Sequence, residues 1–223
     1  MKRYLMLFLL AGLAALVNAQ HKPFQFGVKA SGNMGWFKTD AQHYSNEGVK
    51  PGFSWGFVAD FYLMEHYSVT TGFDMVYLNG KLSYPYLVAE DPAYLVDTVT
   101  TTFKTNYVQL PVVLTMKTNT IKGLRFYGQI GAAAGILIKA REEIVDNGVV
   151  IKDGNSNMFT TLRGSFIFGT GIEIPFGKST YLQTGVQFNN GFTDVLKGNN
   201  QAFPEIENDA RSNFFEFNLS IIF

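Results

Sequence analysis

The feature that most constrains this chain is a two-residue alternation of apolar with polar or small side chains, repeated in segments along its length. In the first such segment the even positions carry Phe24, Phe26, Val28, Ala30, Gly32, Met34 and Trp36. Successive side chains of a β-strand point to opposite faces, so each segment has one apolar and one polar face. After Val17 no uninterrupted apolar run approaches the roughly 18 residues of a membrane-spanning helix. The chain is therefore predicted to be all-β.

Eight segments carry this alternation: 24–36, 53–63, 67–77, 108–116, 124–138, 163–174, 182–188 and 215–223. Pro111 lies within the fourth of them and has no backbone donor, which predicts a bulge or weak pairing at that point.

The connections between these segments alternate between long and short. The long ones are 38–51, 80–105, 139–162 and 190–211, and the short ones are 65–66, 118–123 and 175–179. In an up-and-down barrel every second connection lies at the same end, so one rim carries turns and the other carries loops. We therefore predict a closed antiparallel up-and-down transmembrane β-barrel of eight strands.

One long connection contains its own hairpin signal. The dipeptide Asn147-Gly148, which is favoured in two-residue hairpin turns, lies between the apolar-rich segments 143–146 and 149–152. We interpret it as a hairpin that projects outside the membrane. The alternative is a ten-strand barrel, whose extra strands would fall short of the roughly 9 to 11 residues needed to span.

The N-terminus is typical of a secretory signal peptide: Lys2 and Arg3, an apolar stretch to Val17, and a small residue at Ala19. Removal of residues 1–19 leaves residues 20–223 as one domain, with 16 basic against 18 acidic residues of the original 18 and 18, a net charge of −2. This excludes a basic surface for nucleic acid. The chain has no cysteine, which excludes disulfides and thiolate metal sites.

If the apolar faces meet lipid, the opposite faces bring charged side chains into the barrel. The predicted interior network consists of Lys29, Asp60, Asp74, Arg125, Glu173 and Glu216. An eight-strand barrel is only wide enough for side chains to fill, so these charges are expected to pair and to plug the interior. The alternative is a path for ions or protons, because buried charges are either paired or functional.

The last strand alternates to the terminal carboxylate, with an apolar face made of Phe215, Phe217, Leu219, Ile221 and Phe223. This face resembles the C-terminal signal that the outer-membrane assembly machinery recognises, since an extended aromatic edge can pair with a template strand. A buried edge strand of a soluble sheet is the alternative.

The segment 106–114, Asn-Tyr-Val-Gln-Leu-Pro-Val-Val-Leu, resembles a strand of the PorT-like family of outer-membrane β-barrels, which are small barrels of the OmpA and OmpX kind. Gln109 stands where an acidic residue is common in that family. The resemblance covers Phe24 to Phe223 and implies an outer-membrane location, lipid contact, and secretion-machinery or adhesion partners.

One long loop is unusually apolar, with a patch formed by Tyr84, Tyr86, Leu87, Tyr94 and Leu95. These side chains are expected either to close the barrel mouth as a lid, which we favour, or to bind an extracellular or envelope protein.

The three histidines, His21, His43 and His66, fall in different places and form no catalytic spacing. The sequence therefore predicts a non-enzymatic protein with no catalytic residues, cofactor or metal. Two alternatives stay open. One is an exported soluble lipocalin-type barrel with inward apolar faces, and the other is an outer-membrane hydrolase.

Overall fold

The computed structural model describes residues 24–90, 93–177 and 179–223, so the predicted signal peptide and His21 lie outside the described residues. The described chain forms the strands β1 (Phe24–Lys38), β2 (Ser45–Met64), β3 (Tyr67–Glu90), β4 (Ala93–Lys117), β5 (Arg125–Asp146), β6 (Val149–Asn155), β7 (Leu162–Pro175), β8 (Tyr181–Gly191) and β9 (Arg211–Ile222). Among these residues there is no helix of the length and apolar character that a membrane span needs.

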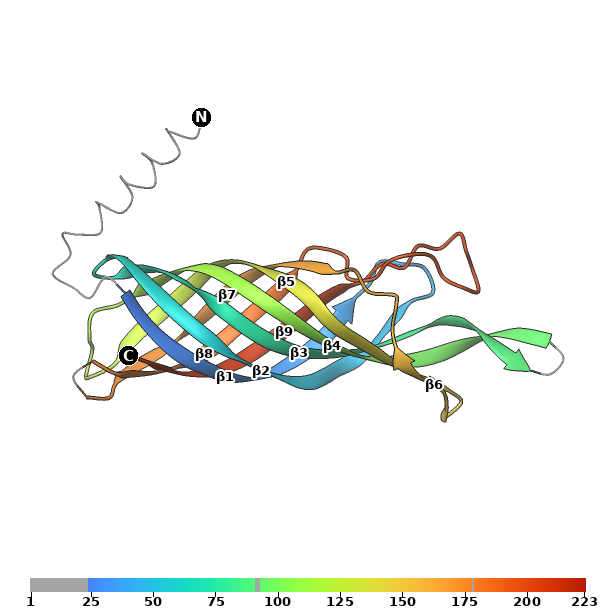
Figure 1. Cartoon of the computed structure of the whole chain (residues 1–223), viewed down its shortest axis with the longest axis horizontal. Helices are drawn as coiled ribbons and strands as arrows, with labels where there is room; N and C mark the ends of the chain where they lie inside the picture. Colours follow the sequence, from blue (N-terminus) through green and yellow to red (C-terminus); the bar gives the residue numbers. More distant parts are fainter. Residues whose placement is uncertain (1–23, 91–92, 178) are drawn as a thin grey trace, which may run out of the picture.

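Eight strands close into one antiparallel ring, in the order β1, β2, β3, β4, β5, β7, β8 and β9, with β9 paired back to β1 (Figure 1). The predicted eight-strand barrel is confirmed. Strand β6 pairs only with the outer end of β5 in the described sheet, so the ten-strand alternative is wrong. Asn147 and Gly148 have φ values of 45° and 85°, as the turn between β5 and β6 requires.

The two rims of the barrel differ in the predicted way. Residues 65–66, 118–124 and 176–180 form the short connections at one rim, where β1 begins and the C-terminus lies. The long connections extend from the opposite rim (Figure 1). Because outer-membrane barrels carry short periplasmic turns and longer extracellular loops, the second rim is the extracellular one.

The long connection 80–105 is not a loop, which corrects the sequence interpretation. Strands β3 and β4 stay paired from Lys81 and Thr102 to Glu90 and Ala93 within this segment. Strand β5 continues past residue 139 to Asp146 and pairs with β6 as the hairpin predicted around Asn147-Gly148, and β2 already begins at Ser45. These strand extensions are stable because one of their faces packs on other connections above the barrel. The strand pattern of a membrane barrel does not predict this contact.

Pro111 weakens its local pairing without shifting the register. On β3, Thr71 pairs with Val112 and the next pair is Asp74 with Gln109, so two positions are skipped. The hydroxyl of Thr71 donates to the Pro111 carbonyl at 2.8 Å. The side chain thus replaces part of the missing ladder.

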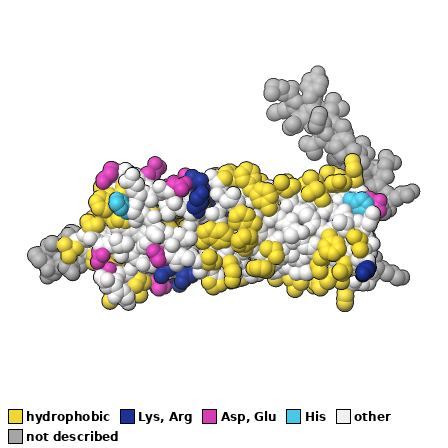
Figure 2. All heavy atoms as spheres, turned by 180° about the vertical axis from the view of Figure 1, so that it is seen from behind, with side chains coloured by type: hydrophobic (Ala, Val, Ile, Leu, Met, Phe, Trp, Pro, Cys, Tyr) yellow, Lys and Arg dark blue, Asp and Glu magenta, His cyan; other side chains and the backbone are white. Residues whose placement is uncertain are grey.

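The outer surface of the barrel is apolar and the interior is polar. Phe26 and Phe57 are 56% and 51% exposed, whereas Asp60 and Glu173 are each 1% exposed. Figure 2 shows hydrophobic side chains over the barrel wall and charged ones mainly at the loop end. A lipocalin-type barrel would have the reverse arrangement, with its apolar faces turned inward, so that alternative is wrong.

Aromatic rings gather near both rims. The Trp36 ring lies 6.1 Å from that of Phe188 and 5.7 Å from that of Phe215 on the loop side. On the turn side the Phe24 and Phe61 rings are 5.1 Å apart. Such belts are typical of the two membrane interfaces, where aromatic side chains meet the headgroups.

Candidate functional site

The barrel interior contains a first group of paired charges, the Lys29 cluster, formed by Lys29, Asp74 and Glu216 from β1, β3 and β9. The Lys29 ammonium lies 2.8 Å from the Asp74 carboxylate and 3.0 Å from that of Glu216. The Ser31 hydroxyl also donates to Glu216 at 2.7 Å. Two buried anions therefore share one buried cation and a hydroxyl donor, the pairing that burial demands.

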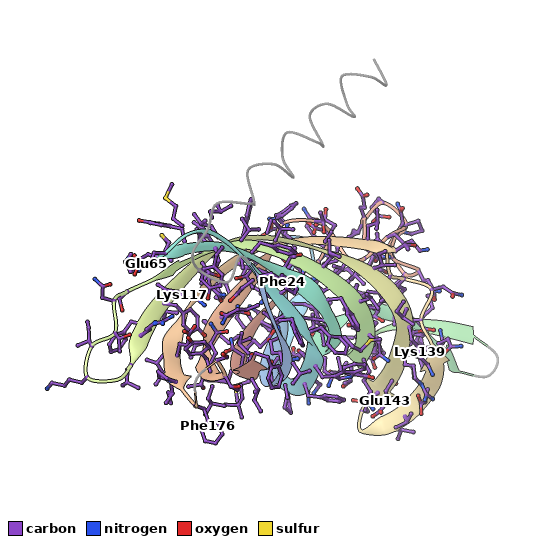
Figure 3. All side chains as sticks on the ribbon, turned by 60° about the vertical axis from the view of Figure 1, so that its left-hand side comes forward. Phe24, Glu65, Lys117, Lys139, Glu143 and Phe176 are labelled. Atoms are coloured by element: carbon purple, nitrogen blue, oxygen red, sulfur yellow. The ribbon has the colours of Figure 1, made fainter. Side chains whose placement is uncertain are left out.

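A second group, the Lys117 cluster, lies close to the turn rim. The Lys117 ammonium is 3.2 Å from the Asp60 carboxylate and 2.8 Å from that of Glu173, and all three side chains are at most 2% exposed. Arg125 reaches Glu173 at 3.2 Å. Figure 3 shows Lys117 at the same end as Glu65 and Phe176.

The six predicted interior charges thus divide into two clusters, and each of them contacts an opposite charge. The predicted set did not contain Lys117, which supplies the cation of the second cluster. The strand alternation could have identified it, because Lys117 lies two residues beyond Thr115, on the same polar face as Thr115 and Gln109.

Arg163 is a second interior cation that was absent from the predicted set. Its guanidinium donates to the Ser212 hydroxyl at 2.7 Å, to the Ser212 carbonyl at 2.9 Å, to the Gln109 amide oxygen at 3.2 Å and to the Ser165 hydroxyl at 3.1 Å. Its Cζ also lies 5.2 Å from the centre of the Phe214 ring. Neutral oxygens, that of Gln109 among them, and an aromatic face therefore hold this charge.

Polar side chains fill the rest of the lumen. Gln187 donates to Gln129 at 2.6 Å, and Gln129 donates to the Thr115 hydroxyl at 2.9 Å. The cavity between these hydrogen-bonded side chains and the Lys29 cluster has a volume of about 30 Å³. That is room for about two water molecules at this point of the lumen.

An apolar plug covers the extracellular end of this polar lumen. The buried members of this outer apolar cluster are Phe37, Leu82, Tyr84, Val99, Phe103, Ala140, Ile144, Phe159, Val195, Leu196 and Ala210. The Phe103 ring makes edge contacts with Phe37 at 5.8 Å and with Phe159 at 5.2 Å. The cluster joins the extended β3–β5 strands to the connections before β7 and β9.

The predicted loop patch is divided by this cluster. Tyr84 is buried in it, Tyr86 packs against it and Leu87 is half-buried. Leu95 is 51% exposed near the tip of the β3–β4 hairpin, whereas the side chain of Tyr94 lies outside the described residues. The inner half of the patch therefore has the position of a lid, and Leu95 has the position of a contact surface.

The apolar face of the last strand points outward along β9. Phe215, Phe217, Leu219, Ile221 and Phe223 are between 42% and 55% exposed. Strand β9 pairs with both β1 and β8, and the Phe223 amide donates to the Phe26 carbonyl at 2.8 Å. This strand therefore closes the ring and places its aromatic edge toward lipid.

The described histidines lie at opposite ends of the barrel. His43 is in the connection between β1 and β2, with its ring 5.8 Å from that of Phe203, and His66 is in the β2–β3 turn. Across residues 24–90, 93–177 and 179–223, no group of three or more His, Cys, Asp or Glu side chains could hold a metal ion.

Together, the closed ring, the lipid-facing apolar wall and the ion-paired lumen define a class: small transmembrane β-barrels. A family model described as "Outer membrane protein beta-barrel domain" matches residues 18–197, and the chain belongs to this family. It is an integral protein of the outer membrane, as the sequence predicted.

Solved structures with similarity to the chain include several outer-membrane barrels. Neisserial surface protein A (NspA) is 12% identical, with a TM-score of 0.47 and coverage of 90% of this chain and 96% of that chain. OprG from Pseudomonas aeruginosa is 10% identical, with a TM-score of 0.49 and coverage of 91% and 97%. The outer membrane protease OmpT from Escherichia coli is 7% identical, with a TM-score of 0.42 and coverage of 93% and 99%. Comparison with curated proteins gives no match.

Proposed function

We propose that this protein is a non-enzymatic outer-membrane anchor whose barrel holds an extracellular binding structure and conducts no solute. The observation that carries the proposal is the outer apolar cluster, which packs the extracellular strands and connections into one body above an ion-paired lumen. Buried aromatic rings packed across the extracellular opening would obstruct permeation, so they do not suit a protein whose role is to conduct a solute.

The energetic cost of opening supports the plugged state. An ion that crossed the lumen would have to displace buried pairs such as Lys29 with Asp74 and Lys117 with Glu173. Separation of a buried pair leaves uncompensated charges and costs about 3–5 kcal/mol. The crossing ion would then also have to pass the apolar cluster, whose apolar side chains do not replace its hydration.

The β3–β4 hairpin supports a role in contact with a partner. From Gly80 to Glu90 it extends about 30 Å at roughly 3.4 Å per residue, and it projects from the loop rim in Figure 1. Leu95 and Val96 are both 51% exposed near its tip. Exposed apolar groups at the end of a rigid arm are typical of protein-binding surfaces. An adhesion partner or a secretion-machinery component, as the PorT-like resemblance implies, fits this surface.

The hydrolase alternative has less support from the geometry. Hydrolysis needs a base that is oriented by an acid and close to a nucleophile. Within the described part of the chain, no hydrogen bond joins the His43 imidazole to a carboxylate, and its nearest aromatic contact is Phe203.

The first test of the proposal is permeation. The refolded protein is expected to give no conductance steps in planar bilayers and no sugar-driven swelling of liposomes, with a general porin as the positive control. Regular single-channel steps at neutral pH would refute the plugged anchor.

The second test concerns the hairpin tip. Cross-linking on intact cells is expected to give a discrete product with the wild type that disappears in the Leu95→Ser, Val96→Ser double variant. The matched control is Val149→Ser with Val150→Ser, which changes equally exposed apolar residues on the neighbouring hairpin. Equal cross-linking in both variants would show that the hairpin tip is not the contact surface.

A further inference from the structure

An open cavity of about 260 Å³ lies on the extracellular side of the outer apolar cluster. Its walls come from the β3 extension, the β5–β6 hairpin, the connection before β7 and the connection before β9. Tyr44 from the first long connection completes the wall. In Figure 3, Lys139 and Glu143 mark the part of β5 that continues from the barrel into this region. The cavity therefore belongs to the body that we propose as the binding structure.

One wall of the cavity is a braced aromatic surface. The Tyr44 and Tyr84 rings stack at 5.1 Å with an interplanar angle of 14°. The Tyr44 hydroxyl donates to the Asn208 side-chain oxygen and accepts from the Asn200 amide at 2.9 Å. Asn200 also donates to the Pro85 carbonyl at 3.0 Å. These bonds hold the tyrosines in place before any ligand arrives, which lowers the ordering cost of binding.

A second part of the wall, on the same face of the extended β3–β5 strands as Tyr84, holds a buried carboxylate. Glu142 is 3% exposed, and its Oε1 accepts from the Lys152 ammonium at 2.5 Å. Its Oε2 is buried and has no hydrogen-bond partner among the described residues. A buried carboxylate oxygen without a donor is costly, so a rotation of this side chain toward the cavity that it lines would let a ligand supply the donor.

The remaining lining groups are neutral amides and two cations. Asn155, Asn157 and Gln201 carry side-chain amides that make no side-chain hydrogen bond within the described part of the protein. Each amide can donate and accept at once, which suits hydroxyl groups. Lys152 and Lys197 also line the cavity, but Lys152 is paired with Glu142 and Lys197 is exposed to solvent, so neither cation is a buried unpaired charge that an anionic ligand would neutralise.

The tyrosine hydroxyls near the cavity are neutral groups. Burial raises the pKa of Tyr44 and of Tyr84 above the usual value, so both phenols stay protonated at neutral pH. Tyr86, which is half-buried and lines the cavity, adds a ring that is not fully covered by the cluster. Aromatic rings offer an apolar face to the C–H side of a ligand that is polar at its edge.

We propose that this cavity binds one neutral saccharide unit, with a sugar hydroxyl donating to the Glu142 carboxylate, the amides around its edge and a tyrosine ring against its C–H face. The volume of about 260 Å³ is just below that of sites for drug-sized molecules, about 300–1,000 Å³, and suits a single ring. This inference rests on the proposed function, because it gives the extracellular binding structure a ligand class.

The test uses the mature full-length protein refolded in nanodiscs. The probes are the methyl glycosides of glucose, galactose, mannose and N-acetylglucosamine, with glucuronate as the acidic probe and glucosamine as the cationic one. Saturation-transfer NMR detects binding, and calorimetry gives the Kd. At least one neutral glycoside is expected to bind more tightly than both charged probes.

The discriminating variants are Glu142→Gln and the neighbouring control Glu143→Gln. Glu143 lies on the opposite face of β5, 37% exposed and 3.5 Å from Lys104. Glu142→Gln is expected to weaken the neutral glycoside by about tenfold or more, since a charge-assisted acceptor is lost. Glu143→Gln is expected to change the Kd less than about twofold. Tyr86→Ala should weaken binding more than Tyr86→Phe, which keeps the ring.

Three results would overturn the saccharide site: no neutral glycoside binds, a charged probe binds best, or Glu142→Gln and Glu143→Gln have equal Kd values. Heat-modifiable gel migration of each variant shows that the barrel has folded. Failure of the saccharide site alone leaves the permeation and tip-variant results unchanged, whereas conductance steps would remove the proposed anchor function itself.

Discussion

Replacement of Lys117 by methionine tests whether the buried charges hold the barrel together. Lys117 is 2% exposed and is the cation shared by Asp60 and Glu173. In the Lys117→Met variant Glu173 keeps Arg125, but Asp60 keeps only the Thr70 hydroxyl as a side-chain donor among the described residues. Loss of one partner from a buried ion pair costs about 3–5 kcal/mol, because the remaining charge stays in a medium that solvates it poorly.

This loss is large compared with a total stability of about 5–15 kcal/mol. With a urea dependence of about 2 kcal/mol per molar, the unfolding midpoint is expected to fall by roughly 2 M. Urea titration of the protein in lipid vesicles, followed by tryptophan fluorescence and by gel migration, measures this shift. Two probes are needed because a common midpoint supports two-state unfolding.

The matched control is Lys104→Met. Lys104 also forms an ion pair, with Glu143 at 3.5 Å, but its side chain is 57% exposed. Exposed pairs contribute about 0–1 kcal/mol, so this variant is expected to unfold close to the wild type. Addition of Asp60→Asn to Lys117→Met should recover part of the loss, since it removes the unpaired charge. Equal midpoints for Lys117→Met and Lys104→Met would refute the reasoning and indicate that water solvates the Lys117 cluster.

Three further changes test other parts of the molecule. Burial raises the pKa of Asp209 to about 6 from 3.8, so the folded state holds this proton more tightly and stability should fall as the pH rises from 3.8 to 6. Asp209→Asn should remove that decline and be the more stable protein at pH 7, and melting curves with the same pH profile for both proteins would contradict this. Gly72→Ala should cost more than about 2 kcal/mol in urea titrations, because its Cβ would overlap the Phe57 carbonyl oxygen at a φ of +146°. Gly128→Ala has open space and should be neutral; similar losses in both would rule out the steric cause. If the C-terminal strand is the assembly signal, Phe223→Ala should slow the appearance of folded protein in pulse-chased envelopes and leave its urea midpoint nearly unchanged, since this side chain is 45% exposed, and unchanged assembly kinetics would count against the signal.

The strand extensions outside the membrane could not be predicted from the local sequence. The alternation predicted strand 67–77 and then a loop, but β3 continues to Glu90 with Leu82 and Tyr84 buried on one face. Those side chains face the outer apolar cluster, which is assembled from distant connections. The sequence predicted an apolar lid from residues such as Tyr84, but not the extended strands that carry it or the distant residues such as Phe159 and Val195 that complete it.

The role proposed for Glu142 could not be predicted from the local sequence either. In the sequence it is one of two adjacent glutamates in a segment assigned to a loop. Its partner Lys152 lies across the β5–β6 hairpin, and the cavity that it lines also contains residues 197–208, more than fifty positions away. Nothing local distinguishes it from Glu143, because the difference is only which side of the extended β5 each one occupies.

The sequence by itself determined the number of spanning strands, the alternation of turns and loops, and the inward direction of residues such as Lys29 and Asp60. These properties follow from a side-chain period of two, which each segment carries on its own. Only the tertiary structure decided that Lys117 pairs with Asp60 and Glu173, and which distant residues pack with Tyr84 at the mouth. A shift of two residues between strands leaves every side chain on the same face but gives it a new neighbour, so partners depend on the register of the closed ring.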